Sequence, residues 1–394
     1  MKSKRNALGT KDFCMKIAIV SSRGGGLDTY ALEAGHWLNQ HDHTVHLIYV
    51  GERPPQLPER YSALRVHTAQ TRKYLYYLSR LQIPYASIIA QYERTRAVAQ
   101  VAHAIRTADG LDFVEIPEGY AGARLMGGIP FIVRLHGAEW AFRRYCEDGT
   151  YPRIIESIQG RMMLAAVQRH SVSMAYATFI AGACRVPPRL IDLIRYPIDF
   201  AQFPQREPPP DGAPYHLAIV GRLERRKGVH TLIAALPKVW AAEPETYVHF
   251  FGKDGNYGRA QIDAAIPPDV QRGRLIFYNF VPRQQLIDQL YRTHVYVGPT
   301  RFETSGLHLQ EAMSAGRPVI ASRMGPLPEF IRHEETGWLV PLDDANALAD
   351  AIIHALRHPE EREAYGRAGR ELARRMFDID TVMPQQLALY QRDF

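Results

Sequence analysis

The sequence predicts an α/β protein of two domains, each built on a doubly wound parallel sheet. Three observations carry this prediction. Short apolar runs, typical of buried parallel strands, alternate with helical stretches. The alternation stops at residues 204–214, PQREPPPDGAP, and then begins again. The length of 394 residues also exceeds what a single hydrophobic core usually serves.

The first domain is expected to cover residues 1–205 and the second residues 206–377. The predicted strands of the first domain are 16–22, 44–51, 113–117, 130–137 and a short one at 177–182. Those of the second domain are 217–222, 247–252, 274–280, 295–300 and 317–322. Two such Rossmann-like domains form a cleft where they face each other, and open α/β sheets bind ligands at the carboxyl ends of their strands. Each motif below falls at such a strand end.

The composition is that of an ordinary globular protein, with 46% hydrophobic and 23% charged residues. No uninterrupted apolar run reaches the roughly 18 residues of a membrane-spanning helix. The basic and then apolar start of the chain imitates a signal peptide, but its apolar part is short and runs into glycines, which favours a first strand. Three widely spaced cysteines, Cys14, Cys146 and Cys184, fit neither a disulfide framework nor a zinc site. We therefore expect a cytoplasmic protein.

Positive charge is concentrated in the first half of the chain. Residues 1–205 hold 25 Lys and Arg against 17 Asp and Glu, a net charge of +8, whereas residues 206–394 hold 23 against 24, a net charge of −1. A basic half suits an anionic membrane surface or a phosphorylated substrate, but a solvated basic face explains it as well. The stretch 71–100 mixes basic residues with tyrosines and suits either the inner face of a membrane or a helix packed in the first domain. The charge forms no obvious recognition element for nucleic acid, so no nucleic-acid partner is expected.

The segment 301–319, RFETSGLHLQEAMSAGRPV, places two glutamates eight residues apart around the start of a helix. The first N–H groups of a helix lack partners within it, so an oxyanion can bind there, and Gly306 lets it approach the backbone. Glu303 and Glu311, on either side, can accept hydrogen bonds from sugar hydroxyls. The structural alternative is that Ser305 caps the helix, Glu303 complements the helix dipole and Glu311 is surface charge.

A second motif, IVGRLERRKG, ends a strand at Arg222 and opens the next helix after Lys227. Both residues are expected at the same sheet edge as segment 301–319. There they would neutralise a diphosphate and help it to depart as a leaving group. Because Arg225 and Arg226 lie beside them, a solvated basic loop is the alternative.

Weaker signals lie at strand ends of the first domain. The turn after its first strand contains Gly25 and Gly26 and only partly matches a dinucleotide-binding fingerprint, with Glu52 as a weak ribose contact near the end of the second strand. His136 follows a strand into the expected cleft and could contact a reacting sugar. Glu118 could contact the hydroxyls of a second substrate. A tight turn, a structural histidine and a helix cap are the respective alternatives.

Taken together and in this order, these motifs resemble family 4 of the GT-B glycosyltransferases. The resemblance covers nearly the whole chain and is most specific in EAMSAGRPVIAS, which completes the Glu-x7-Glu element, and in TGWLVPLDDANALADAI at 336–352. It implies the GT-B architecture, with residues 378–394 packing back on the first domain. It also implies an enzyme that moves a sugar from a nucleoside-diphosphate sugar to a hydroxyl of a glycan, lipid-linked or small-molecule acceptor, with retention of configuration and without a metal.

The resemblance assigns roles to residues of this chain. The diphosphate would be held by two basic side chains and three helix-start amides, the nucleotide ribose by Glu311, the transferred sugar by Glu303 and the base by Val281. The expected catalytic residues are His136, Arg222, Lys227 and Glu303. The expected donor-binding residues are Gly25, Gly26, Arg222, Lys227, Val281, Glu303, Ser305, Gly306, Leu307 and Glu311. Glu118 is the expected acceptor contact.

The chain departs from the family pattern in segment 301–319. Thr304-Ser305 replaces the usual aromatic-glycine pair, and His308 and Gln310 stand where apolar residues are common, which bears on the identity of the sugar.

No metal site or other cofactor is expected. Asp378-Ile379-Asp380 matches the Asp-x-Asp of metal-dependent sugar transfer, but it stands at the start of the last helix, where Asp is an ordinary cap. The alternative function is a sugar-nucleotide-binding or epimerase-type protein on the same fold that transfers no sugar.

Overall fold

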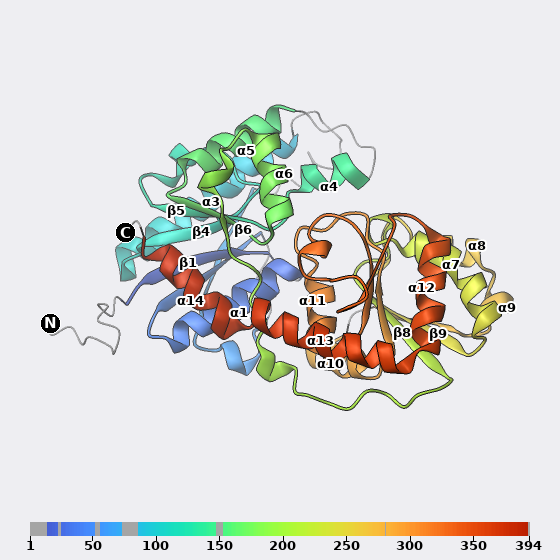
Figure 1. Cartoon of the computed structure of the whole chain (residues 1–394). Helices are drawn as coiled ribbons and strands as arrows, with labels where there is room; N and C mark the ends of the chain where they lie inside the picture. Colours follow the sequence, from blue (N-terminus) through green and yellow to red (C-terminus); the bar gives the residue numbers. More distant parts are fainter. Residues whose placement is uncertain are drawn as a thin grey trace.

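The computed structural model describes residues 14–22, 25–51, 56–72, 86–146, 153–279 and 281–392. It contains two separate parallel sheets with helices on their faces, and a C-terminal helix pair that extends from one half of the molecule to the other (Figure 1). This arrangement confirms the predicted fold class of two Rossmann-like domains.

The first sheet has seven strands in the order β3-β2-β1-β4-β5-β6-β7, all parallel. Its strands are β1 (Lys16–Ser21), β2 (Thr44–Val50), β3 (Arg65–Ala69), β4 (Phe113–Pro117), β5 (Phe131–Leu135), β6 (Gln168–Ser171) and β7 (Asp192–Leu193). Central strands are buried along almost their whole length, as the continuous apolar runs predict for a sheet covered on both faces. Strand order reverses beside β1, and such a reversal is where doubly wound sheets bind ligands.

Helices cover both faces of the first sheet (Figure 1). They are α1 (Gly26–Gln40), α3 (Ala86–Asp109), α4 (Glu139–Cys146), α5 (Ile154–Ala165) and α6 (Met174–Cys184). The prediction of a short strand at 177–182 was wrong, because this segment lies inside α6. Ser173 caps that helix by accepting a hydrogen bond from the Tyr176 amide at 3.1 Å, and the alanines that follow favour a helix.

The second sheet has six parallel strands in the order β10-β9-β8-β11-β12-β13. They are β8 (Tyr215–Val220), β9 (Thr246–Phe251), β10 (Leu275–Tyr278), β11 (Val295–Gly298), β12 (Val319–Ser322) and β13 (Trp338–Val340). The first sheet ends before the proline-rich segment 204–214, and the second sheet begins after it. The boundary at residues 205 and 206 itself stays a prediction.

Alternate residues of the second sheet face two apolar layers. Val295 and Val297 contribute to the cluster under α7 and α12, whereas Tyr296 contributes to the cluster under α10 and α11. The helices are α7 (Val229–Ala242), α8 (Arg259–Ala265), α9 (Pro268–Gln271), α10 (Arg283–Tyr291), α11 (Leu307–Ser314) and α12 (Ala345–Arg357). Helix α11 follows β11 directly, so its first turn lies at the carboxyl edge of the sheet.

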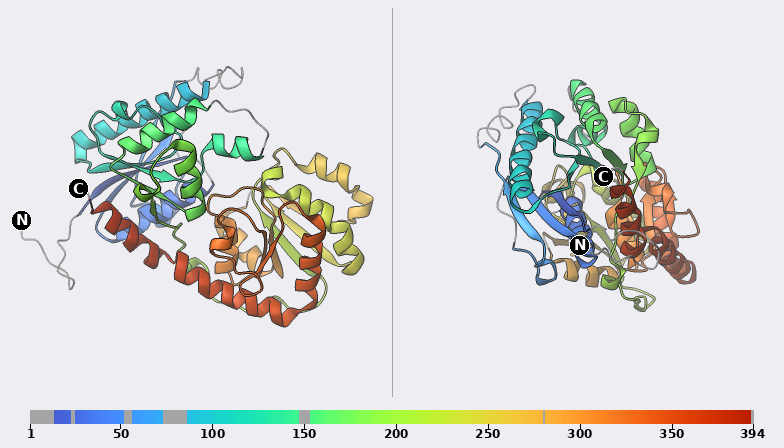
Figure 2. Two further views of the ribbon diagram at one scale, coloured as in Figure 1. Left: turned by 45° about the horizontal axis from the view of Figure 1, so that its top comes forward. Right: turned by 90° about the vertical axis from the view of Figure 1, so that its left-hand side faces the viewer.

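The last two helices join the two halves of the molecule (Figure 2). Helix α13 (Pro359–Phe377) packs on α11, and α14 (Ile379–Tyr390) packs on α1. Asp378 caps α14 by accepting from the Asp380 amide at 3.2 Å, and Asp380 accepts from the Trp37 indole at 3.0 Å. The C-terminal segment therefore packs back on the first domain, as predicted, and the Asp-x-Asp pair serves as a cap and an anchor.

A buried carboxylate fixes α14 to the first sheet. Glu115 on β4 accepts hydrogen bonds from Tyr30 at 2.6 Å, Tyr390 at 2.6 Å and Gln386 at 3.1 Å, and His170 lies 3.2 Å away. Burial opposes ionisation, but His170 and the other polar partners outweigh it and lower the pKa of Glu115 to about 2. Two residues of α14 thus contribute to a charged network in the core of the first domain.

None of the helices in the described part of the chain is long and apolar enough to cross a membrane.

Candidate active site

The predicted anion site forms at the start of α11. Gly306 caps this helix with φ of +77°, and a Cβ there would lie 2.8 Å from Leu327 Cδ2, so the backbone requires glycine. The structure does not use Ser305 as a side-chain cap, because its Oγ instead accepts a hydrogen bond from Gln310 at 2.9 Å. No described residue accepts a hydrogen bond from the amides of Ser305, Gly306 and Leu307. These donors are therefore left for an anion.

Lys227 and Glu303 form a buried ion pair beside this helix start. The ammonium Nζ lies 2.5 Å from Glu303 Oε1, and the side chains are 12% and 9% exposed. Burial lowers the pKa of Lys227, while the attraction of Glu303 acts in the opposite direction. Burial likewise opposes the charge of Glu303, but Lys227 and His308 outweigh it and hold the pKa of that carboxyl well below its ordinary value. The structure thus brings a predicted phosphate ligand and a predicted sugar ligand into contact.

A hydrogen-bond relay that the sequence patterns did not reveal also reaches Glu303. His308 Nε2 lies 3.1 Å from Glu303 Oε1, and its Nδ1 lies 2.8 Å from the Tyr296 hydroxyl, which accepts from the Val220 amide at 3.0 Å. Burial lowers the pKa of His308, and Lys227 lowers it further, so the imidazole is neutral at neutral pH. Since a carboxylate only accepts, Nε2 carries the proton and Nδ1 accepts from Tyr296.

These contacts leave one oxygen of Glu303 available. The bonds from Lys227, His308 and Thr300 all converge on Oε1, the last at 3.2 Å. Within the described ranges, Oε2 has no hydrogen-bond partner. Glu303 is therefore oriented by one oxygen and can accept from a ligand with the other.

Glu311 lies further along α11 and is paired with a residue that the sequence reasoning missed. Arg283, at the start of α10, donates to Glu311 at 2.7 Å and to Gln202 at 2.8 Å. Gln202 in turn donates to Glu33 of α1 at 2.9 Å. A chain of hydrogen bonds thus joins the predicted ribose ligand to the first domain. Arg283 follows Val281, the expected contact of the base, by two residues, and this position is the one sequence signal for it.

Arg222 lies apart from the buried pair in this structure. Its side chain is 69% exposed and forms an ion pair with Glu224, which also lies 3.4 Å from Arg226. Arg226 in turn stacks over the Phe142 ring at 4.9 Å. The structure therefore brings Lys227 to Glu303 but leaves Arg222 in solvent.

The first domain contacts the α11 region directly. Thr304 donates to the carbonyl of His136 at 2.6 Å, and its own carbonyl accepts from Ser173 at 2.6 Å. A Cβ on Gly26 would lie 3.6 Å from Leu307, so the glycine turn also lies against the helix start, while Gly25 adopts φ of +79° next to open space. The strand ends of both domains meet here, as predicted.

His136 is held by the first domain. Its Nδ1 lies 2.5 Å from the Tyr196 hydroxyl, and its ring lies 5.2 Å from the Tyr30 ring. Burial, reinforced by Arg134 and His170, lowers the pKa of His136 well below its ordinary value. The imidazole is therefore neutral at neutral pH.

Glu118 is a carboxyl group buried beside His136. Its Oε1 accepts from the Gly137 amide and from the Tyr176 hydroxyl, the latter at 3.1 Å, whereas Oε2 is buried with no partner in the described part of the chain. Burial raises the pKa of Glu118 to about 8, although both hydrogen bonds act against the shift. The group is therefore largely protonated at pH 7 and is not the helix cap of the structural alternative.

The remaining predicted contacts are peripheral or lie outside the described residues. Val281 is half-buried against the apolar cluster under α10 and α11. Glu52 lies outside the described residues, as does 73–85, a large part of the basic stretch 71–100.

The two Rossmann-like domains define a GT-B architecture, and comparison with known proteins agrees. Residues 201–372 match the family model described as "Glycosyl transferases group 1". The second domain of this chain therefore belongs to the glycosyl transferases group 1 family, as its motifs predict. The narrower assignment to family 4 stays a prediction.

Curated relatives and solved structures are similar to parts or all of the chain. Glycogen synthase of Mycobacterium tuberculosis is 34% identical over 262 residues, which are 66% of this chain and 63% of the relative. Phosphatidyl-myo-inositol mannosyltransferase of Mycobacterium leprae is 33% identical over 170 residues, or 43% of this chain and 44% of the relative. The chain thus spans less than two thirds of the length of these relatives.

Solved structures support the fold over almost the whole chain. Sucrose-phosphate synthase from Thermosynechococcus elongatus has a TM-score of 0.78 at 22% identity and covers 96% of this chain and 98% of its own. The Anabaena HepE protein, in complex with UDP and glucose, has a TM-score of 0.73 at 17% identity, with 96% and 100% covered.

Proposed function

We propose that this protein is a retaining glycosyltransferase of family 4 that takes its sugar from a nucleoside-diphosphate donor without a metal. The observation that carries the proposal is the group of free amides at the start of α11, beside the buried ion pair of Lys227 and Glu303. Amides and an ammonium suit a diphosphate, and the carboxylates at either end of the motif suit the hydroxyls of its two sugars.

In the proposed donor complex, the diphosphate binds the amides of Ser305, Gly306 and Leu307. The ammonium of Lys227 contacts it from the side of β8, and Arg222 folds in from solvent once an anion is present. These donors stabilise the negative charge that develops on the leaving diphosphate. Val281 borders the base, as the family resemblance implies.

The two glutamates then hold hydroxyls. Glu311 accepts from the ribose while Arg283 keeps the carboxylate in place. Glu303 accepts from the transferred sugar through Oε2, and its Oε1 remains held by Lys227 and His308. The neutral imidazole of His136 donates a hydrogen bond to the sugar from the first domain, and Gly25 and Gly26 let the donor approach the backbone.

In the proposed transfer, the bond between the anomeric carbon and the leaving phosphate oxygen breaks. The acceptor hydroxyl oxygen forms its bond to the anomeric carbon from the same face, which retains the configuration. The acceptor proton passes to the leaving phosphate oxygen, so that no protein base is required. The products are the glycoside and the nucleoside diphosphate.

The acceptor is proposed to bind the first domain near Glu118, whose protonated carboxyl can both donate and accept. It is a glycan, a lipid-linked acceptor or a small molecule with a free hydroxyl. The names of the relatives, which act on glycogen and on phosphatidyl-myo-inositol, support the first two. We further propose a cytoplasmic location, with the basic first domain docking on the inner face of a membrane in envelope glycan synthesis.

Product analysis tests this proposal. The protein would be incubated in EDTA with uridine, guanosine and adenosine diphosphate sugars and with a panel of glycan and lipid-linked acceptors. We expect one donor to give a glycoside whose anomeric proton coupling in NMR shows retention, with release of the nucleoside diphosphate. Conversion of the donor into an epimer, or binding without turnover for every acceptor, would instead support the alternative of an epimerase or a binding protein.

A further inference from the structure

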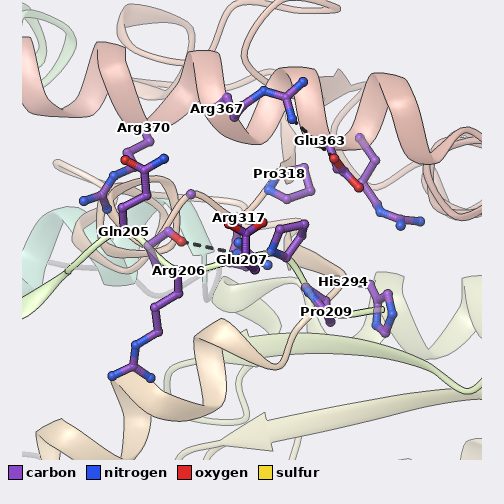
Figure 3. Close-up of a pocket in the computed structure, with 14 residues that line it drawn as sticks. Gln205, Arg206, Glu207, Pro209, His294, Arg317, Pro318, Glu363, Arg367 and Arg370 are labelled. Atoms are coloured by element: carbon purple, nitrogen blue, oxygen red, sulfur yellow. Dashed lines mark hydrogen bonds and ion pairs between the residues drawn. The ribbon is translucent and has the colours of Figure 1, made fainter. Parts of the chain in front are cut away.

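A cavity with several charged residues in its wall lies at the amino edge of the second sheet, away from the proposed donor site. It has a volume of about 130 Å³ and is enclosed by the linker after residue 204, by the turn before β12 and by α13 (Figure 3). The residues next to it precede β11 and β12, whereas the proposed donor site follows the carboxyl ends of β8 and β11. The two sites are therefore separate.

A buried arginine lines this cavity without a counter-charge bound to it. Arg317 is only 4% exposed, and its Nε donates to the Ala315 carbonyl at 3.3 Å. No described residue accepts a hydrogen bond from its two terminal nitrogens. Figure 3 shows its side chain between the linker and α13. A buried guanidinium with unused donors is costly unless an anion pairs with it.

The surroundings of Arg317 increase the positive potential. Burial, together with the charges of Arg362 and Arg370, lowers the pKa of Arg317 to about 10, although Tyr291 and Glu363 act in the opposite direction. Burial and nearby positive charge thus make the cation unfavourable, and an incoming anion would relieve this cost.

The other two arginines have their donors engaged by the protein. Arg362, 3% exposed, bonds to the carbonyls of Ala355 and Leu356 and to Asp211. Arg370 bonds to the carbonyls of Ser314 and Phe203, the latter at 2.5 Å.

Arg362 and Arg370 therefore fix the wall of the cavity and add positive charge to it, while Arg317 keeps free donors. Their partners come from residues 203–211, which include the linker, and from α11 and α12, so the wall joins three segments of the chain.

Two carboxylates also line the cavity and set what it can accept. Glu363 pairs with Arg367 at 3.3 Å on α13, and Glu207 is exposed in the linker. Glu207 forms no ion pair with any described residue, so it repels an anion without being neutralised. The site suits one compact phosphate group and not a polyphosphate, because the volume is small and the net charge modest.

We propose that this cavity binds a phosphate group, either inorganic phosphate or the phosphate of a monoester, through the terminal nitrogens of Arg317. The bound group lies between the linker and α13, which both line the cavity.

Titration calorimetry tests this with inorganic phosphate and with a hexose monophosphate. The experiments use the full chain carrying Lys227→Ala, so that anion binding near α11 is weakened in every protein that is compared. In that background we expect binding of at least one probe, and Arg317→Gln to weaken it by about tenfold or more, as expected for loss of a charge-assisted hydrogen bond to phosphate. Tighter binding of inorganic phosphate would identify the free ion as the ligand. Tighter binding of the hexose monophosphate would identify a sugar phosphate as the ligand.

Two further variants control the result. Arg332→Gln removes an arginine that is exposed and already paired but does not line the cavity, and it should change the affinity by less than about twofold. Glu207→Gln removes the unneutralised carboxylate and should tighten binding by about threefold. No binding of either probe, or equal affinity of the Arg317→Gln variant, would overturn the proposal. If that variant fails to fold by circular dichroism, the Glu207→Gln variant decides, and an unchanged affinity there would refute the site.

Discussion

The imidazole of His308 holds the same oxygen of Glu303 that pairs with Lys227, at 3.1 Å and 2.5 Å respectively. The far side of the imidazole is fixed by the Tyr296 hydroxyl at 2.8 Å. Because Glu303 is proposed to hold the transferred sugar, this relay sets the direction in which its free oxygen points. The departure from the family pattern at position 308 thus has a defined structural role.

Replacing His308 by Ala should lower kcat/KM for the donor sugar by about 10- to 100-fold, since hydrogen bonds to charged groups are worth about 1.5–3 kcal/mol. The affinity for the nucleoside diphosphate alone should stay within about twofold, because the relay does not contact the diphosphate. Tyr296→Phe should reproduce part of the loss. Steady-state kinetics with calorimetry measures both, and an equal loss of nucleotide and sugar-nucleotide affinity would show that His308 only supports the local fold.

Glu311→Ala should weaken binding of the nucleoside diphosphate by about tenfold, as expected for loss of a charge-assisted hydrogen bond to a hydroxyl. The sharper test compares the nucleotide with its 2′- and 3′-deoxyribose analogues. The native protein should bind the analogues more weakly, whereas the variant should not distinguish them. Glu335→Ala, an exposed carboxylate far along the chain, serves as the control. A variant that still prefers the full ribose would rule out the role assigned to Glu311.

The buried Glu115 should make the folded protein less stable at acid pH. Its pKa of about 2 in the folded protein lies below its ordinary value of 4.5, so the unfolded chain binds more protons between these values. The stabilisation is present above about pH 4.5 and is lost as the pH falls towards 2, with a total of about 3 kcal/mol at 1.36 kcal/mol per pKa unit. Denaturant unfolding of the native protein and of Glu115→Gln should converge as the pH is lowered over this window. Parallel curves would contradict the ionised state of Glu115.

The buried Glu118 should have the opposite effect and make the folded protein less stable as the pH rises. Its pKa of about 8 in the folded protein exceeds its ordinary value, so the folded state binds the additional proton and loses stability as the pH rises from about 4.5 to 8. Glu118→Gln keeps the hydrogen-bond acceptor without the titration. It should therefore be more stable than the native protein at pH 8 by at least about 1 kcal/mol and similar to it near pH 4.5. A constant difference between the two proteins across this range would refute the raised pKa.

Much of the architecture could be predicted from the sequence because it depends on local patterns. Apolar runs such as KIAIV locate the buried strands, and the prolines of segment 204–214 separate the two sheets. The strand predicted at 177–182 failed because an apolar run alone does not distinguish a strand from a helix, and the cap at Ser173 decided in favour of α6. The edge strand β3 is half-buried and lacks such a run.

The candidate site could be predicted only where its residues follow a motif. Segment 301–319 and Lys227 were found because a helix start after a strand has a sequence signature. Arg283 and Tyr296 were not, because their partners lie 28 and 12 residues away and depend on how helices pack. The exposed position of Arg222 also depends on its ion pair with Glu224, and the motif gives no indication of that pair.

The measurement that tests the central claim most directly is calorimetric binding of nucleoside diphosphates and their sugars to the native protein and to Lys227→Ala, in EDTA. Our account predicts that one nucleotide binds the native protein, and that the variant binds it at least about tenfold more weakly because a diphosphate loses its buried cation. Equal binding to both proteins, or no binding of any nucleotide to the native protein, would contradict a donor site at the start of α11.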